Sequence, residues 1–236
     1  AEDAEFPRPV RQRAARTGTI LGLLLLATCS DEGSDCQVPL DEQEAPKSKA
    51  GYFPLEFTRS GITCNFGSRK CLPTLSGFEI DWYSAQLEAA KEPSLYLASR
   101  AARPTDALAV RFTWLRSFHP PVVVRIEGAR SKGFQLVAKE LSGPGGYEPG
   151  QVARTVNRQL TAAEAARLHE MLARSRLFSL PAKDCLMGCD GASWVFEGVD
   201  SDGYHFVDRW TPEEGRVKEL GMFFLGLSGW RFTDVY

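Results

Sequence analysis

Three stretches in the middle of the chain alternate apolar and polar side chains, and they are Leu108–Leu115, Val122–Glu127 and Phe134–Leu141. In the first stretch, Val110, Phe112 and Trp114 share one face. Arg111 and Thr113 occupy the other face. A period of two is typical of strands that bury one face in an antiparallel sheet. The sequence therefore predicts a sheet of neighbouring antiparallel strands rather than a helical bundle.

Further strands are expected on both sides of this region. Phe53–Thr58 precedes it, and Val152–Gln159 follows a loop rich in glycine and proline. Ala192–Val199 and Tyr204–Trp210 predict a hairpin, because glycine in the connecting Asp200–Gly203 permits positive φ. The sheet is therefore expected to contain about five to six strands.

Three helices are expected from capping signals. Asp81 is a suitable N-cap for a helix over residues 82–91. Thr161–Glu164 forms a capping box, which opens a helix that runs to Ser175. A second capping box, Thr211–Glu214, begins a helix with proline at its favoured first position.

The order of these elements indicates the fold class. A meander, a helix, a hairpin and a further helix do not alternate as βαβ units would. The expected class is α+β, with a single antiparallel sheet and two or three helices packed on one of its faces. Residues 52–236 are expected to form one such domain, which is long enough for a substantial hydrophobic core.

A short leucine-rich run near the start of the chain has arginines before it and a cysteine after it. The strongly apolar part extends only from Ile20 to Ala27, whereas a membrane-spanning helix needs roughly 20 apolar residues. Its length is that of the hydrophobic region of a secretory signal, with Arg16 and earlier arginines as the positive region. Since the chain begins with Ala1 rather than methionine, we expect translation to start downstream, at Val10.

The end of this run, Leu26-Ala27-Thr28-Cys29, resembles the bacterial lipobox, in which leucine and small residues precede a lipid-bearing cysteine. Threonine departs from the glycine, alanine or serine that is usual at its position. The resemblance implies that residues 1–28 are a signal peptide and that Cys29 carries a diacylglycerol anchor. It implies a lipoprotein of the bacterial cell envelope, and Ser30 permits sorting to the outer membrane with the domain facing the periplasm.

Residues 29–51 are acidic, poor in aromatic residues and interrupted by Pro39 and Pro46. This composition predicts a flexible tether, because such a segment buries little apolar surface. The whole chain has a formal net charge of −2, so it lacks the basic footprint of a nucleic-acid-binding protein. The expected partners are the membrane, through Cys29, and an envelope protein or a cell-wall component.

Four cysteines form two closely spaced pairs in the sequence. An exported chain reaches a compartment that permits disulfides, so we expect Cys64 to pair with Cys71. By the same reasoning we expect Cys185 to pair with Cys189. Cys36 is then the odd thiol, which stays free, pairs between molecules or displaces one of these bridges.

Zinc is an alternative role for Cys185 and Cys189, with His205 as a third ligand. Structural zinc sites usually have two cysteine pairs, or one pair together with two paired histidines. The three histidines, His119, His169 and His205, form no such pair. We therefore expect no metal and no cofactor.

Several polar residues are candidates for a binding or catalytic surface, namely Arg116, His119, Asp190, His205 and Asp208. Arg116 and His119 belong to a proline-rich connector that suits contact with an anion or a peptide. His205 and Asp208 are expected to point to opposite faces of their strand, because successive side chains alternate. Asp190, in the preceding loop, is therefore the candidate catalytic partner of His205.

These observations favour a non-enzymatic envelope lipoprotein that acts as a binding or interaction module. The alternatives are a periplasmic hydrolase that uses Asp190 and His205, and a protective inhibitor or immunity-type protein. Four segments resemble parts of uncharacterised bacterial proteins, and they are residues 112–121, 143–150, 190–194 and 207–212. That resemblance implies no activity.

Overall fold

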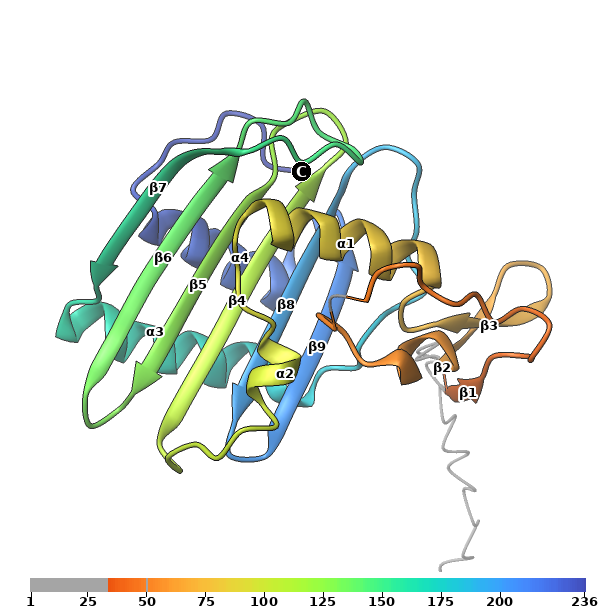
Figure 1. Ribbon diagram of the computed structural model, residues 1–236, viewed down its shortest axis with the longest axis horizontal. Coiled ribbons are helices and arrows are strands. Elements are labelled where there is room, and N and C mark those ends of the chain that lie inside the picture. The colour runs from red at the N-terminus through yellow and green to blue at the C-terminus, as the bar shows by residue number, and fades with distance from the viewer. Residues whose placement is uncertain (1–33, 50) are drawn as a thin grey trace, which may run out of the picture. The chain divides into compact units, whose positions relative to one another are not determined.

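The computed structural model of the chain describes residues 34–49 and 51–236 (Figure 1). Within these residues, the fold is built on one six-stranded antiparallel sheet. Its strands are β4 (Ala107–Arg116), β5 (Val122–Ala129), β6 (Gly133–Leu141), β7 (Val152–Gln159), β8 (Ala192–Asp200) and β9 (Gly203–Trp210). Their spatial order is β7-β6-β5-β4-β8-β9, so the meander and the later hairpin join side by side through β4 and β8.

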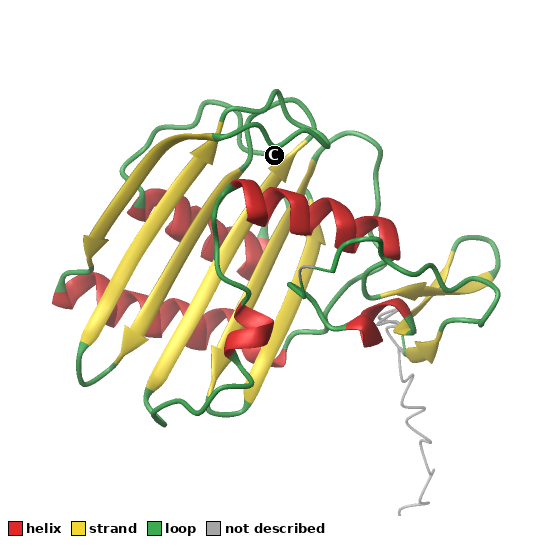
Figure 2. Ribbon diagram, viewed as in Figure 1, coloured by secondary structure: helices red, strands yellow, loops and turns green. Residues whose placement is uncertain are grey.

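Helices cover both faces of this sheet (Figure 2). α1 (Gly77–Ala89) and α2 (Leu95–Ala98) lie on one face. α3 (Ala162–Ser175) and α4 (Gly215–Leu227) lie on the other. None of the helices in the described part of the chain combines the length and the apolar character needed to cross a bilayer.

A smaller antiparallel sheet precedes α1 in the sequence and contains β1 (Asp35–Gln37), β2 (Ser60–Asn65) and β3 (Arg69–Pro73). Two short 3-10 helices complete the described fold, η1 (Leu55–Thr58) and η2 (Leu177–Ser179). The predicted α+β class is confirmed. The predicted single sheet with helices on one face is wrong, because a second sheet is present and α1 and α2 cover the other face.

The large sheet has an apolar core on each side. On one side, Phe112 of β4 packs with Leu168 of α3 and Phe224 of α4. On the other side, Val195 of β8 packs with Leu87 of α1. The predicted alternation in β4 is confirmed, but both of its faces are covered, so all ten of its residues are buried.

α1 begins earlier than the sequence predicts. Ser76 is its N-cap, because the Ser76 hydroxyl accepts a hydrogen bond from the Glu79 backbone N–H at 3.1 Å. The Glu79 carboxylate accepts one in return from the Ser76 backbone at 2.7 Å, which completes a capping box. Asp81, the predicted N-cap, lies inside α1 and accepts hydrogen bonds from the backbone of Lys47 and Ser48.

The two other predicted capping boxes have different outcomes. The Thr161 hydroxyl accepts a hydrogen bond from the Glu164 backbone at 3.2 Å, so the predicted start of α3 is confirmed. Thr211 does not cap α4, because its hydroxyl accepts a hydrogen bond from the Ala192 backbone at the start of β8. The strand predicted at residues 53–58 is also wrong, since η1 occupies most of it.

Two disulfides link described residues, Cys36–Cys71 and Cys64–Cys185, and Cys189 is an exposed free thiol. Disulfide bonding is confirmed, but the predicted pairs Cys64–Cys71 and Cys185–Cys189 are wrong. In the register of β2 and β3, Cys71 lies opposite Thr63 rather than opposite Cys64. Because neighbouring strand side chains point to opposite faces, Cys64 and Cys71 point away from each other.

Part of the predicted tether belongs to the fold. β1 pairs with β2, and Cys36 on β1 is bonded to Cys71 on β3. Val38, the next apolar residue, is buried. Strand pairing and a disulfide therefore order a segment whose own apolar content is small. The lipobox-like motif, Val10 and the rest of residues 1–28 lie outside the described residues.

Peptide mapping without reduction tests the disulfide pattern. It should recover Cys36 joined to Cys71 and Cys64 joined to Cys185, while iodoacetamide should label the exposed Cys189 in the native protein. The double variant Cys64→Ser/Cys185→Ser should lose roughly 2–5 kcal/mol of unfolding free energy in denaturant titrations, because this bridge closes a long loop. Recovery of a peptide that joins Cys64 to Cys71 would contradict this connectivity.

Candidate functional site

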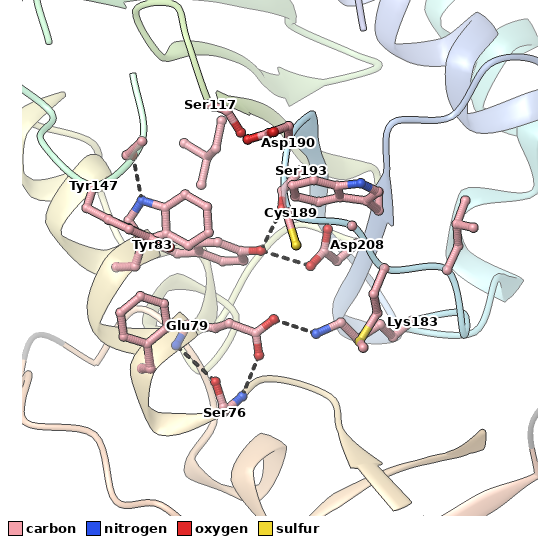
Figure 3. A pocket seen from close by; sticks show the side chains of 18 of the residues that line it. Ser76, Glu79, Tyr83, Ser117, Tyr147, Lys183, Cys189, Asp190, Ser193 and Asp208 are labelled. Carbon is pink, nitrogen blue, oxygen red and sulfur yellow. Dashed lines mark hydrogen bonds and ion pairs between the residues drawn. The ribbon is translucent and has the colours of Figure 1, made fainter. Parts of the chain in front are cut away.

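A pocket of about 490 Å³ opens beside α1 (Figure 3). Side chains from α1, β8 and β9 line it, together with the connectors around Ser117 and Tyr147. The segment Lys183–Asp190, here called the pocket loop, forms much of the remaining wall. A concave site that gathers side chains from distant parts of a chain is the first candidate for binding or catalysis.

Three buried polar side chains form the floor of the pocket. Tyr83 of α1, Ser193 of β8 and Asp208 of β9 are 2%, 3% and 4% exposed. The Tyr83 hydroxyl donates to Asp208 Oδ2 at 2.9 Å, and Ser193 Oγ lies 3.0 Å from the same hydroxyl. Because a phenol has only one proton, Ser193 donates to Tyr83, and this chain of hydrogen bonds directs the phenol toward Asp208.

The carboxyl group of Asp208 is perturbed by its surroundings. Burial raises its pKa from 3.8 to about 6, although Lys183 and the hydrogen bond from Tyr83 oppose the shift. Burial and the charge of Asp208 raise the pKa of Tyr83 well above its usual value, so the phenol remains a donor. Among the described residues no group donates a hydrogen bond to Asp208 Oδ1. The floor therefore presents a carboxylate of which the described residues satisfy one oxygen, Oδ2.

Exposed apolar side chains surround the mouth of the pocket, and they are Phe78, Phe118, Tyr147, Leu186 and Met187. They are 48–65% exposed. Only five other large apolar side chains of the described residues are exposed, and those line other parts of the surface. Exposed apolar side chains that cluster are typical of interaction sites, whereas single exposed apolar residues are common on any protein.

Aromatic contacts hold one wall of the pocket together. The Trp82 ring lies 5.1 Å from the Tyr147 ring, and the Phe78 ring lies 5.3 Å from Tyr147. The Trp82 indole N–H donates to the Gly146 carbonyl at 3.0 Å. These contacts fasten the β6–β7 connector to α1 and leave aromatic surface facing the pocket.

The pocket loop is fixed at its first residues. Lys183 Nζ lies 2.6 Å from Glu79 of α1, and Cys185 is bonded to Cys64 of β2. Arg209 Nε lies 3.2 Å from Asp184 Oδ2. The loop therefore connects α1, the small sheet and β9 around the pocket.

The end of the pocket loop packs closely on Trp210. A Cβ atom at Gly188 would lie 2.2 Å from the Trp210 indole nitrogen. At Gly191, where φ is +154°, a Cβ atom would lie 2.2 Å from the Thr211 hydroxyl. Because glycine has no side chain, both positions allow the backbone to approach Trp210 and Thr211 this closely.

Negative charge predominates in the pocket. Of the residues that the structure describes, four carboxylates line it, those of Glu79, Asp184, Asp190 and Asp208, against the single amine of Lys183. Glu79 and Asp184 have the ion-pair partners described above. Within the described residues, no cation lies within ion-pair distance of Asp190 or of Asp208. Two carboxylates of the pocket, Asp190 and Asp208, are therefore without an ion-pair partner among the described residues.

The structure separates the predicted catalytic pair. Asp190 and Asp208 both line the pocket, whereas His205 lies on the opposite face of β9 and its ring is 6.0 Å from Phe178. Burial lowers the pKa of His205, which favours its neutral form. The prediction that His205 and Asp208 point to opposite faces is confirmed. Asp190 and His205 do not share a site.

The other two predicted surface residues have structural contacts. Arg116 is buried rather than exposed, donates to the Pro120 carbonyl, and lies 4.2 Å from the centre of the Trp114 ring. His119 Nδ1 is 2.8 Å from the Tyr236 hydroxyl. Neither residue lines the pocket. Arg116 is therefore not exposed as predicted, whereas a contact of His119 with an anion or a peptide stays a prediction.

Two of the three ligands proposed for the alternative zinc site are not available to it. Cys185 is bonded to Cys64, so it cannot supply a thiolate. His205 lies on the far face of β9 from the pocket loop that carries Cys189. Cys189 alone remains in the pocket wall.

Sequence reasoning missed the α1 side of the pocket. Tyr83 and Trp82 lie in a helix that was predicted only in part, and nothing in their spacing indicates contact with β9. Asp208 and Asp190 were identified because they stand in a dense polar and aromatic region. The exposed rim residues come from four separate connections or helices, so only the folded chain brings them together.

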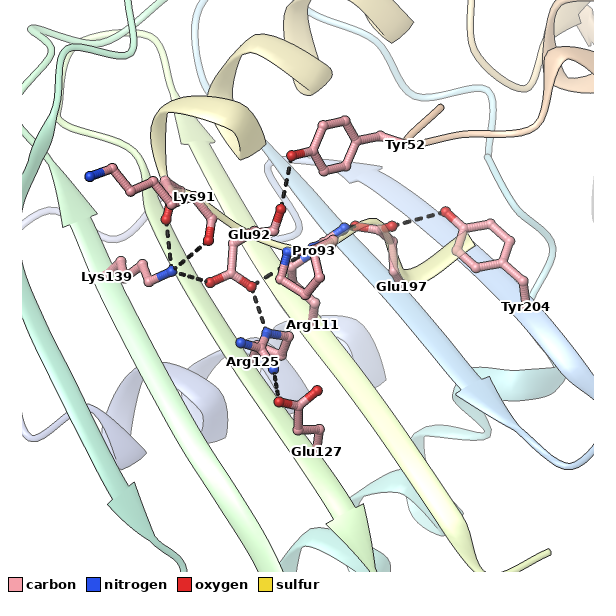
Figure 4. Close-up of polar contacts among 11 residues, drawn as sticks. Tyr52, Lys91, Glu92, Pro93, Arg111, Arg125, Glu127, Lys139, Glu197 and Tyr204 are labelled. Carbon is pink, nitrogen blue, oxygen red and sulfur yellow. Dashed lines mark hydrogen bonds and ion pairs between the residues drawn. The ribbon is translucent and has the colours of Figure 1, made fainter. Parts of the chain in front are cut away.

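A second polar cluster lies under α1 and α2 and fastens this helical layer to the sheet (Figure 4). Arg111 of β4 lies 2.6 Å from Glu197 of β8, and both side chains are almost fully buried. Glu92, just after α1, accepts hydrogen bonds from Arg125 and Lys139 at 2.7 and 2.6 Å. These charges satisfy one another inside the fold, so the cluster is structural rather than open to a ligand.

Comparison with known proteins gives no assignment. No family model matches this chain, and no curated protein or solved structure matches it. The geometry and chemistry of the pocket are therefore the basis for assigning a function.

Replacement of Asp208 by asparagine tests the cost of its buried charge. Asp208 has a pKa of about 6 when folded, above its ordinary 3.8, so its ionisation weakens the fold as pH rises through this range. Asp208→Asn should therefore be more stable than the wild type at pH 8, by on the order of 3 kcal/mol. The difference should vanish near pH 4 in urea titrations, and equal stability at both pH values would contradict the assignment.

Replacement of Arg111 tests the second cluster. Arg111→Ala leaves Glu197 buried without its partner, so the unfolding free energy should fall by about 3–5 kcal/mol. Arg167→Ala is the matched control, since Arg167 forms an exposed ion pair with Glu170 on α3. That control should cost less than about 1 kcal/mol, and similar losses for both variants would refute a special role for Arg111.

Proposed function

We propose that this chain is a non-enzymatic binding module of the bacterial cell envelope, and that it holds a peptide segment of a partner in the acidic pocket. The observation that supports this most is the ring of exposed apolar side chains around one pocket with a polar floor. A partner segment would insert one side chain and cover the apolar rim with its neighbouring residues.

The groups in the pocket suit binding better than catalysis. Ser193 donates to the Tyr83 hydroxyl and not to a basic side chain. Tyr83 donates to the Asp208 carboxylate, but burial raises the pKa of Tyr83 well above its usual value, so the phenol keeps its proton and does not act as a base for Ser193. Cys189 is a potential nucleophile, but none of the described residues that line the pocket is a histidine that could take its proton. The polar groups therefore orient a ligand rather than attack it.

The proposed location rests on two features of the chain. The Leu26-Ala27-Thr28-Cys29 motif resembles a lipobox, which supports a lipid anchor on Cys29. Two disulfides among the described residues fit an oxidising compartment such as the periplasm.

The anchor is tested by expressing the full chain and its Cys29→Ser variant in a Gram-negative bacterium. The first should fractionate with membranes and incorporate labelled fatty acid, and the variant should do neither. Unchanged fractionation and labelling of the variant would contradict lipidation at Cys29.

Binding is tested with the full chain carrying Cys29→Ser, which keeps it free of lipid, against an immobilised library of random heptapeptides. Selected peptides should bind saturably, and Phe118→Ala/Tyr147→Ala should weaken them at least about tenfold, because both side chains form the rim. Phe66→Ala is the matched control, since Phe66 is exposed but lies outside the pocket. The proposal fails if no peptide binds, or if the rim variant and the control bind equally well.

A further inference from the structure

We infer that the side chain taken into the pocket is cationic, so that the module selects a lysine or arginine flanked by apolar residues. This inference rests on the proposed function and adds the chemical class of the ligand. Three properties of the pocket lead to it: two carboxylates without an ion-pair partner, the orientation of the floor and the aromatic walls.

The first property is the negative charge of two carboxylates that have no ion-pair partner among the described residues. Asp190 is an exposed residue of the pocket lining, and Asp208 lies at the buried floor. The two other carboxylates of the pocket already have cationic partners. An anionic ligand would meet repulsion from Asp190 and Asp208, and a neutral ligand would leave their charge unbalanced. A cation is the class of ligand that completes the charge balance.

The second property is the fixed orientation of the floor. Asp208 is only 4% exposed, and the Tyr83 hydrogen bond holds its Oδ2 atom in place. No described group donates to Oδ1. The Tyr83 hydroxyl accepts a hydrogen bond from Ser193 and donates its only proton to Asp208. Tyr83 therefore cannot donate to a ligand without breaking its hydrogen bond to Asp208. The floor therefore offers acceptors, which match the N–H groups of an ammonium or guanidinium ion.

The third property is the aromatic surface of the walls. Trp82, Tyr147 and Trp210 all line the pocket. An aromatic face attracts a cation through its quadrupole, and the same face packs on the methylene groups of a long basic side chain. The exposed rim residues Leu186 and Met187 would then contact the apolar neighbours of that side chain. A basic residue within an apolar segment satisfies floor, walls and rim together.

The groups around Asp208 also determine how binding should depend on pH. Glu79 and Tyr83 face it from α1, Lys183 approaches from the pocket loop, and Arg209 is its neighbour on β9. Protonation of Asp208 removes the charge that attracts the ligand. The affinity for a cation should therefore rise between pH 5 and pH 7.5, in which range a lysine side chain remains charged.

The test uses the full chain with Cys29→Ser and four soluble probes. Three are blocked peptides, acetyl-Leu-Leu-X-Leu-Leu-amide, in which X is lysine, its uncharged analogue norleucine, or glutamate. The fourth is chitotriose, a neutral sugar that aromatic walls could also hold. Isothermal titration calorimetry at pH 5 and pH 7.5 measures the dissociation constant of each probe. At pH 7.5 the lysine peptide should bind at least about tenfold more tightly than the norleucine peptide.

Variants then connect this preference to the floor. Asp208→Asn should abolish the preference for lysine and its pH dependence, and the matched control Asp202→Asn, in the exposed β8–β9 turn, should change neither. If Asp208→Asn does not fold, as judged by circular dichroism, Asp190→Asn provides the second test. Asp190 is exposed, and its replacement should reduce the preference for lysine severalfold.

The possible results separate the two proposals. Equal binding of the norleucine and lysine peptides, with loss of both in Phe118→Ala/Tyr147→Ala, would overturn the cation inference and support peptide binding. Tighter binding of the glutamate peptide or of chitotriose would also overturn the inference. If no probe binds and the heptapeptide library gives no binder, the proposed function fails as well.

Discussion

The fold depends on the burial of charged residues in the centre of its large sheet. β4 and β8 are covered on both faces, so Arg111 and Glu197 lie where neither can reach water. Each is tolerable only because the other is present, since an unpaired charge at this depth costs several kcal/mol. Glu92 extends the same network to β5 and β6 and ties the end of α1 to the sheet. The charged cluster thus holds α1 and α2 against a face of the large sheet that carries several charged side chains.

The position of this layer creates the pocket. α1 packs across β8 and β9 through apolar contacts. This packing brings the Tyr83 hydroxyl within hydrogen-bond distance of Ser193 and Asp208. The N-terminal turn of α1 also holds the pocket loop, through the ion pair between Glu79 and Lys183. One helix therefore supplies the donor of the floor, part of the aromatic wall and the attachment of the loop. The buried charged network thus fixes the position of α1, and α1 in turn supplies part of the pocket. In this way the pocket depends on the buried network.

The sequence revealed those features that depend on local patterns. Alternation identified the strands of the large sheet and the opposite orientation of His205 and Asp208, and the capping box at Thr161 identified α3. Prediction from the sequence failed for features that depend on contacts between distant parts of the chain. Arg111, Arg125 and Lys139 resemble residues of a solvated sheet face, and only their buried partners show that a second layer covers them. Likewise, Cys64 pairs with a cysteine 121 residues away, because strand register directs it away from nearby Cys71.

The floor of the pocket makes folding and binding depend on each other. Ionised Asp208 weakens the unliganded fold, and a cost on the order of 3 kcal/mol is large for a domain whose total stability is about 5–15 kcal/mol. The proposed cationic ligand would compensate the charge and lower the pKa of Asp208 toward its ordinary value. Below pH 6 the cation must displace a proton, whereas above pH 6 it relieves a destabilising charge. The ligand should therefore stabilise the protein most where the free protein carries the greatest penalty, which an apolar pocket of the same shape would not do.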